Sequence, residues 1–244
     1  MNTPAPPTPP ASSEPVRLLI VDDDPLVRAG LALMLGGGQG IDIVGEGADG
    51  NEAEELVERL RPDVVLMDIR MPVMDGLTAT ERLRRRPDAP EVIVLTTFHA
   101  DEQVLRAIRA GAAGFVLKDT PPTRIVDSVR RVAAGDPVLS PAVTRQLMAR
   151  AAGGGHGDRA DRTERARRRF GQLAEREQDV AVAVGRGGSN AEIAASLYLS
   201  VATVKTHVSR ILAKLELNNR VQIALLVHDA GLLDTDDEGG SHLG

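Results

Sequence analysis

The first half of the chain alternates short apolar runs with amphipathic stretches, and this alternation constrains the fold more than any other feature. The apolar runs are VRLLIV (16–21), IDIVGE (41–46), DVVLM (63–67), EVIVL (91–95) and GFVL (114–117). Short runs rich in Val, Ile and Leu are typical of buried strands. Five such strands separated by helices predict a doubly wound parallel α/β sheet, because apolar strands need helices covering both faces.

Between these runs, apolar residues recur at helical spacing and mark one face of each intervening helix. The residues that we expect on these faces are Val27, Leu31 and Met34, then Val104 and Ile108, and then Ile125, Val129 and Val132. Sheets of this kind bind ligands at the carboxyl ends of their strands, so we expect a site at that edge.

The pattern divides the chain into two domains. The α/β domain spans 16–137, and a small all-α domain spans 171–233, where the periodicity becomes purely helical. The intervening residues, 138–170, contain the aperiodic stretch AAGGGHGD and a charge run, which predict a flexible linker. The Pro-rich lead, 1–15, and the polar tail, 234–244, are predicted to be disordered.

The charge is distributed unevenly between the two domains. The net charge is −6, but residues 16–137 hold 15 Lys and Arg against 21 Asp and Glu, whereas residues 159–232 hold 12 against 8. An acidic half and a basic half suggest two different ligands, with nucleic acid as the partner of the basic half. The alternative is ordinary variation in surface charge.

The composition also bears on location and chemistry. The chain contains no Cys, which excludes disulfides, thiolate metal sites and a cysteine nucleophile. The lead has neither the cationic start nor the apolar run of a signal peptide, and no stretch approaches the roughly 20 apolar residues of a membrane span. We therefore expect a soluble, cytoplasmic protein.

Polar side chains follow successive strands of the predicted sheet. Asp22, Asp23 and Asp24 follow the first strand, Asp68 the third, Thr96 the fourth and Lys118 the fifth. Taken singly, such an Asp is commonly a turn or helix-cap residue and such a Lys a solvated surface residue. Together they suit Mg²⁺ and a phosphoryl group, because Mg²⁺ prefers oxygen ligands and a carboxylate can attack phosphorus. The lysine and the threonine would hold the phosphoryl oxygens.

Four segments, LLIVDDDPLVRAGL, PDVVLMDIRMPVMDG, VIVLTTF and RAGAAGFVLKD, resemble the signature segments of receiver domains of the response-regulator family over residues 16–135. The resemblance implies a flavodoxin-like fold in which Asp68 is the phosphoacceptor. It implies that Asp22 and Asp23 bind Mg²⁺ together with Asp68 and the backbone carbonyl of Arg70.

By the same resemblance, Thr96 is the switch hydroxyl, Lys118 the invariant lysine, and Phe115 the aromatic residue that moves inward on activation. Phe115 fits simple packing against the sheet equally well. Asp24 stands where close relatives often carry His, and it adds negative charge near the metal.

In the second domain, two helices at Asn190–Leu197 and Val201–Leu215 are joined by a short turn, which is helix-turn-helix spacing. Ser200 is a natural N-cap for the second helix. Its apolar face is formed by Val204, Val208, Ile211 and Leu215. The other side carries cations and hydroxyls that suit the major groove of DNA. For Lys205 and His207, an ordinary surface role is the alternative.

The run GGSNAEIAASLYLSVATVKTHVSRILAKLELNNR resembles the DNA-binding domain of LuxR-type regulators, and with the receiver the whole resembles the NarL subfamily of response regulators. Ala174 stands where this family commonly has a capping Thr. The resemblance implies DNA contacts by Thr203, Lys205, Thr206, His207, Arg210 and Arg220. It also implies a dimer contact through the last helix at Val221, Ala224, Leu225 and His228, with two recognition helices roughly 34 Å apart. The alternative for this helix is core packing.

Together with these features, the two resemblances imply a transcriptional regulator, not an enzyme, in which a sensor histidine kinase phosphorylates Asp68 and the regulator then dimerises and binds a promoter. A metal-dependent phosphohydrolase would generally carry a second Asp two residues later, where this chain has Arg70. A DNA-binding regulator that works without phosphorylation is a further alternative.

Overall fold

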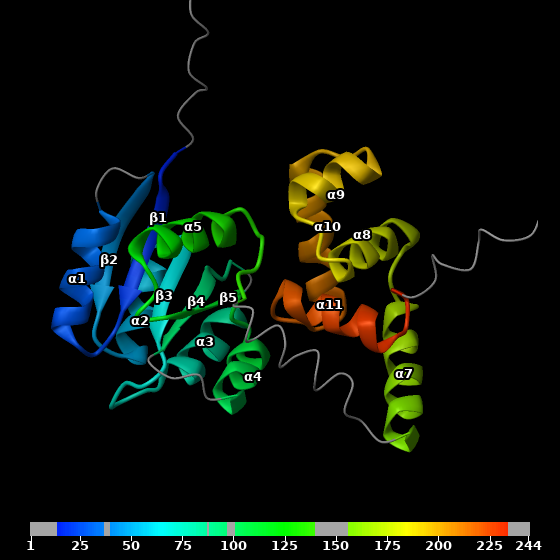
Figure 1. Ribbon diagram of the computed structural model, residues 1–244, viewed down its shortest axis with the longest axis horizontal. Coiled ribbons are helices and arrows are strands. Elements are labelled where there is room, and N and C mark those ends of the chain that lie inside the picture. The colour runs from blue at the N-terminus through cyan, green and yellow to red at the C-terminus, as the bar shows by residue number, and fades with distance from the viewer. Residues whose placement is uncertain (1–13, 37–39, 87, 97–100, 140–155, 234–244) are drawn as a thin grey trace, which may run out of the picture.

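The structure is a computed structural model that describes residues 14–36, 40–86, 88–96, 101–139 and 156–233. These residues form two domains that lie side by side (Figure 1). Much of the predicted lead, tail and linker, at 1–13, 234–244 and 140–155, lies outside the described residues.

The N-terminal domain alternates strands and helices, as the apolar runs predict. Its strands are β1 (Val16–Val21), β2 (Ile41–Gly47), β3 (Val64–Asp68), β4 (Glu91–Thr96) and β5 (Gly114–Leu117). Its helices are α1 (Pro25–Leu35), α2 (Gly50–Leu60), α3 (Gly76–Arg84), α4 (Asp101–Ala110) and α5 (Pro122–Ala133). The strands are all parallel, in the order β2-β1-β3-β4-β5, so the predicted doubly wound sheet is confirmed.

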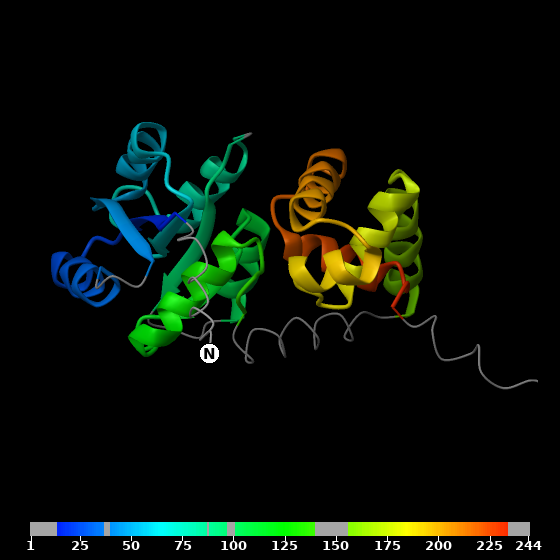
Figure 2. The same cartoon turned by 90° about the horizontal axis from the view of Figure 1, so that it is seen from above.

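Helices cover both faces of this sheet (Figures 1 and 2). Alternate side chains of each strand enter different cores, so Leu19 and Val65 pack with α2, α3 and α4, whereas Leu18 and Val64 pack with α1 and α5. Burial on both faces explains why the strands are continuously apolar and do not alternate with polar residues. Because all five strands point the same way, their carboxyl ends share one edge.

The apolar face of α1 differs from the predicted one. Leu31 is buried and Val27 packs partly against the core, but Met34 is 40% exposed. Leu35, the last residue of the helix, enters the core in place of Met34. The predicted faces of α4 and α5 are buried as expected.

The C-terminal domain consists of helices around a single apolar core. They are α7 (His156–Phe170), α8 (Glu175–Gly185), α9 (Asn190–Leu197), α10 (Val201–Lys214) and α11 (Arg220–Asp229). Ser189 and Ser200 cap α9 and α10, because each hydroxyl accepts a hydrogen bond from the backbone N–H three residues later. Across the described residues of both domains, the structure contains no helix with the length and apolarity that a membrane crossing requires.

The prediction of a flexible linker is wrong for residues 156–170, which form α7. The guanidinium of Arg167 donates to the carbonyl of Ala230 (2.9 Å), and that of Arg169 donates to the carbonyl of Leu215. These carbonyls lie at the C-terminal ends of α11 and α10, where backbone acceptors lack partners within the helix. The charge run that predicted a solvated linker therefore serves to attach α7 to the C-terminal domain.

Candidate phosphoacceptor site and DNA-binding surface

The strand ends bring three of the predicted residues into one cluster. Lys118, just after β5, places its Nζ 2.6 Å from Oδ2 of Asp22 and 3.0 Å from Oδ1 of Asp68. Both carboxylates are buried, and the lysine side chain is 17% exposed. β1 and β5 are separated in the sheet by β3 and β4, so the fold itself creates this contact.

The acidic residues also meet the requirements of a divalent cation. Asp22, Asp23 and Asp68 each offer a carboxylate oxygen, and these three oxygens lie within 4.8 Å of one another. Asp23 is exposed, which leaves the group open to solvent on one side. An all-oxygen donor set of this size fits Mg²⁺. Asp24 lies outside the group and caps α1 by accepting a hydrogen bond from Leu26 N–H (2.8 Å), which is the ordinary role.

The electrostatics of the cluster favour an added positive charge. Burial raises the pKa of the Asp68 carboxyl, although Lys118 acts in the opposite direction. Burial lowers the pKa of the Lys118 ammonium, but its contacts with Asp22 and Asp68 outweigh that effect, so the pKa is raised. One lysine thus pairs with two buried carboxylates, and a third, exposed carboxylate lies beside them.

The remaining predicted residues lie around this cluster. Thr96 ends β4, is 4% exposed, and its carbonyl accepts a hydrogen bond from Lys118 N–H (2.9 Å). The backbone N–H of Arg70 donates to Oδ2 of Asp68 (3.2 Å). Phe115 lies in β5 and is buried in the core on the α4 side of the sheet.

Gly76 is required at the start of α3. A Cβ at this position would lie 1.8 Å from the carbonyl oxygen of Asp68, closer than any side chain can approach. The close approach of α3 to the end of β3 fixes the backbone that carries Asp68. The sequence analysis did not single out this residue, although its place in the MPVMDG segment would have indicated it.

In the C-terminal domain, α9 and α10 form the predicted helix-turn-helix. Lys205, Thr206 and Arg210 are exposed on α10, and Thr203 and His207 are partly buried. His207 Nδ1 is buried and has no hydrogen-bond partner among the described residues. Glu177 of α8 interacts electrostatically with His207, and its carboxylate accepts hydrogen bonds from Ala174 N–H (2.9 Å) and Lys214 Nζ (3.0 Å). Glu177 thus supplies its half of a capping box, and the half that a side chain at Ala174 would supply is missing.

Both domains match known families. Residues 18–130 match the family model described as response regulator receiver domain, and residues 171–227 match the model of bacterial regulatory proteins of the luxR family. The chain is 35% identical over 213 residues to the transcriptional regulatory protein LiaR of Bacillus subtilis, covering 87% of this chain and 97% of LiaR. The chain belongs to the response regulators of two-component systems. Its domain order is that of the NarL/LuxR-type, DNA-binding members.

Two further matches support this assignment. The response regulator VraR of Staphylococcus aureus is 35% identical over 218 residues, covering 89% of this chain and 99% of VraR. Among solved structures, a LuxR-family two-component response regulator from Aurantimonas sp. is 30% identical, with a TM-score of 0.53, covering 57% of this chain and 99% of that one.

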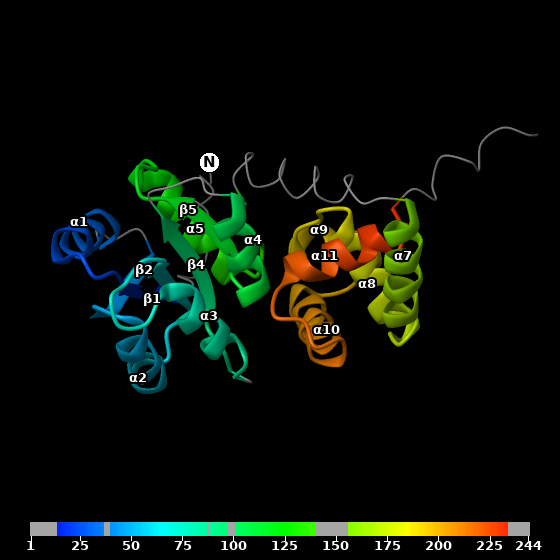
Figure 3. The same cartoon turned by 90° about the horizontal axis from the view of Figure 1, so that it is seen from below.

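The receiver and the DNA-binding domain are docked through α11, whose first turn faces α4 (Figures 1 and 3). Asn219 Nδ2 donates to the carbonyls of Ile108 and Ala112, both at 2.8 Å, while Oδ1 of Asn219 caps α11. Arg84 of α3 donates to the carbonyl of Asn218 (2.7 Å). Sequence reasoning missed these contacts, because a capping Asn looks the same whether or not a second domain lies beside it.

The residues predicted for dimerisation lie in or near this contact. Val221 is buried in the same apolar cluster as Phe115, and Leu225 packs against that cluster. Ala224 is partly buried and His228 is exposed. Arg220, predicted to contact DNA, is 7% exposed and lies between the domains.

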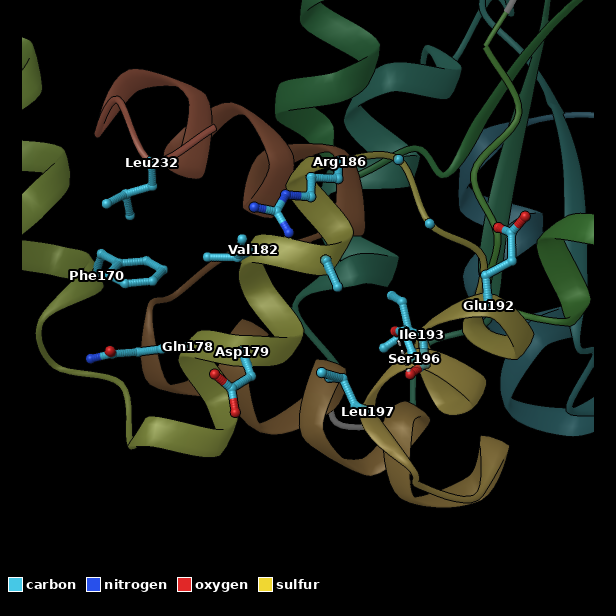
Figure 4. Close-up of a pocket in the computed structure, with 13 residues that line it drawn as sticks. Phe170, Gln178, Asp179, Val182, Arg186, Glu192, Ile193, Ser196, Leu197 and Leu232 are labelled. Carbon is cyan, nitrogen blue, oxygen red and sulfur yellow. Dashed lines mark hydrogen bonds between the residues drawn. The ribbon is translucent and has the colours of Figure 1, made fainter. Parts of the chain in front are cut away.

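A groove of about 910 Å³ lies on the DNA-binding domain among α7, α8 and α9 (Figure 4). Phe170, Val182, Ile193 and Leu197 contribute apolar surface, and Asp179 and Arg186 contribute charge. None of the residues predicted to contact DNA lines this groove. It is therefore separate from the recognition surface of α10.

Proposed function

We propose that this protein is a phosphorylation-dependent transcription regulator in which Asp68 accepts a phosphoryl group and the C-terminal domain binds promoter DNA. The observation that carries the proposal is the meeting of Asp22, Asp23, Asp68 and Lys118 at one edge of the sheet. This arrangement joins a nucleophile, ligands for a divalent cation and a cation for phosphoryl oxygens. A cap role accounts for Asp24, but a turn or cap role leaves the contacts of Lys118 with Asp22 and Asp68 unexplained.

In the proposed reaction, a carboxylate oxygen of Asp68 attacks phosphorus and forms an acyl phosphate, while the bond from phosphorus to a histidine of a sensor kinase breaks. Asp22, Asp23, Asp68 and the backbone carbonyl of Arg70 would hold Mg²⁺, which supplies neutralisation of the charge that gathers on the phosphoryl oxygens. Lys118 leaves Asp68 Oδ1 for a phosphoryl oxygen, and the hydroxyl of Thr96 donates to another.

The switch would pass from this site to the contact between the domains. Movement of Thr96 toward the phosphoryl group leaves room for Phe115 to move inward, and Phe115 shares its apolar cluster with Val221 of α11. A shift of Phe115 therefore changes the surface on which α11 docks. Taking a two-state equilibrium from mostly off to mostly on requires about 5.5 kcal/mol of differential interaction.

We assign DNA binding to α10, where the exposed residues Lys205, Thr206 and Arg210 would face the major groove. Thr203 and His207, which are partly buried, would contribute the polar surface that they leave exposed, and Arg220 would contact a phosphate. Homodimers would form through Val221, Ala224, Leu225 and His228. The docked receiver covers part of that surface, so dimerisation and docking exclude each other.

The proposed partners are a sensor histidine kinase and promoter DNA. The proposed location is the cytoplasm, and the protein would not turn over other substrates as an enzyme does. The rival phosphohydrolase lacks support, because Arg70 occupies the position of its second acid. A regulator that needs no phosphorylation would retain DNA binding but not labelling.

Labelling of the full chain with acetyl phosphate, with and without Mg²⁺, tests the proposal. We expect Mg²⁺-dependent formation of an acyl phosphate, together with increased retardation of duplex DNA. Failure of labelling would leave a regulator controlled in another way, and steady turnover of an aryl phosphate would instead support a phosphohydrolase.

A further inference from the structure

The receiver loop Ala134–Asp136 presents three oxygens to the DNA-binding domain. Oδ1 of Asp136 accepts a hydrogen bond from the backbone N–H of Asn190 (3.0 Å), and the carbonyl of Ala134 accepts one from Nδ2 of Asn190 (2.7 Å). The carbonyl of Gly135 accepts one from Nη1 of Arg220 (3.3 Å), and this nitrogen also lies 3.5 Å from Oδ1 of Asp136. Gly135 has φ of +89°, which favours glycine at this turn.

The donors that receive this loop belong to the DNA-binding domain and are held there independently of the receiver. Nη1 of Arg220 donates to Oδ1 of Asn190 (2.6 Å), and Nη2 donates to the carbonyl of Gly188. Asn190 is the first residue of α9, so its N–H has no acceptor within the helix. Glu192, the other acid at this end, accepts from Ser189 N–H.

The burial of Arg220 adds an energetic reason for an anion at this point. Its side chain is 8% exposed, and burial lowers the pKa of the guanidinium while Asp136 acts in the opposite direction. A buried cation whose partner is withdrawn is strongly destabilising. When the receiver leaves, this guanidinium therefore requires another anion or renewed contact with water.

The same loop also lies against the recognition helix. A Cβ on Gly135 would come within 4.0 Å of Cε of Lys205, a predicted DNA contact on α10. The N-terminus of α9, Lys205 and Arg220 thus surround one short loop of the receiver. An amide at a helix N-terminus and an arginine are the donors that commonly hold DNA phosphates.

We propose that the backbone amide of Asn190, its side-chain amide and the guanidinium of Arg220 form a binding site for one phosphate of the DNA backbone, which the Ala134–Asp136 loop occupies in this structure. Asp136 supplies the charge of the missing phosphate. DNA and the receiver then compete for the same donors. Docking therefore lowers the affinity for DNA in two ways, because the receiver loop occupies these donors and the receiver also covers part of the DNA-binding domain. This proposal rests on the assigned DNA binding, in which Arg220 contacts a phosphate, and adds to that contact the two amides of Asn190 and the competing receiver loop.

The first test compares the unphosphorylated full chain with its Asp136→Asn variant in binding a labelled duplex of random sequence. We expect the variant to bind about tenfold more tightly, the factor that corresponds to one charge-assisted hydrogen bond. Asp127→Asn is the matched control, because Asp127 is exposed on α5 and its substitution removes the same charge. Equal affinities of the two variants would overturn the proposal.

The second test separates a phosphate contact from simple opening of the domains. In the Asp136→Asn background, Arg220→Gln should reduce the dependence of log affinity on log salt by about one unit, whereas Arg220→Lys should retain it. An unchanged slope with glutamine would overturn the phosphate assignment. Thermal unfolding checks that the Arg220 variants fold. The comparison of Asp136→Asn with Asp127→Asn tests the proposal even if the Arg220 variants do not fold. If no variant binds the duplex, even after phosphorylation, the DNA-binding assignment fails with the site.

Discussion

Two charged clusters in this protein use similar chemistry in different structural settings. In the receiver, Lys118 lies 2.6 and 3.0 Å from the carboxylates of Asp22 and Asp68, and all three lie at the carboxyl ends of strands of one sheet. Between the domains, Arg220 lies 3.5 Å from the carboxylate of Asp136, and its partners belong to separate domains. The first cluster persists whenever the receiver is folded, so it can serve as a reaction site. The second exists only while the domains are docked, so it can influence the fraction of molecules in the docked state.

The largest expected effect is on the first cluster. Asp68→Asn should reduce labelling by acetyl phosphate and Mg²⁺ to the background of the assay, because the amide cannot act as the nucleophile. The measurement is an acyl-phosphate mobility shift. Asp127→Asn, an exposed change on α5, should leave labelling intact. Persistent labelling of Asp68→Asn would show that the buried cluster is a structural ion pair and would remove the contrast between the clusters.

The next effect concerns the surface beside the second cluster. Lys205→Ala should weaken binding to duplex DNA several-fold at moderate salt and lower the salt slope by about one unit, because one phosphate contact is lost. Binding titrations over a range of salt concentrations measure both. Arg168→Ala removes an equal charge from α7, where the side chain is 76% exposed, and should leave the slope unchanged. Equal slopes for all three proteins would place the DNA surface elsewhere.

A smaller effect tests whether docking depends on specific hydrogen bonds. Asn219→Ser retains a capping oxygen for Gln222 N–H but cannot reach the carbonyls of Ile108 and Ala112. Loss of these two bonds should destabilise the docked arrangement by about 1–3 kcal/mol and raise the radius of gyration in solution scattering. Asn219→Asp, which also caps but cannot donate, should behave alike. If both variants keep the parent radius, the other contacts between the domains, such as the packing of Val221 and the hydrogen bonds of Arg84 and Asn190, suffice to hold them together.

The smallest effect concerns an ion pair that lies wholly within the DNA-binding domain. The hydrogen bond from Ala174 N–H and the ion pair with Lys214 lower the pKa of Glu177 below its ordinary 4.5. The ionised carboxylate therefore stabilises the fold above pH 4.5, and this stabilisation is lost as the pH falls through the lowered pKa.

Glu177→Gln should accordingly cost about 1 kcal/mol at neutral pH, a modest value because the Lys214 side chain is 43% exposed and screened by solvent. The difference should shrink below pH 4.5. Amide hydrogen exchange in α8 and α10, compared at equal pH, measures it. Glu175→Gln is the control, because it removes a negative charge from the same first turn of α8 without breaking the ion pair with Lys214. It therefore measures the effect of the helix dipole alone. A difference that stays constant with pH would contradict an ionic origin.

The spacing of apolar residues predicted the strands and helices well where these residues pack within their own domain. The predicted strands agree with the observed ones to within one residue at each end, and α9 begins and ends where the spacing indicated. Met34 was misplaced because the i, i+3 and i+4 spacing allows more than one apolar face at the end of a helix. The helix α7 was missed because arginines that cap distant carbonyls resemble a solvated charge run when read in sequence.

The sequence alone determined the parallel sheet, the acidic strand ends and the recognition helix, because each follows from residues close together in the chain and from the rule that parallel strands share an edge. Tertiary structure decided which cations meet which anions across the two domains. Arg220 and Asp136 are far apart in the sequence, and no periodicity relates them. Charged groups are paired by packing, and only the docked domains bring that arginine to the receiver.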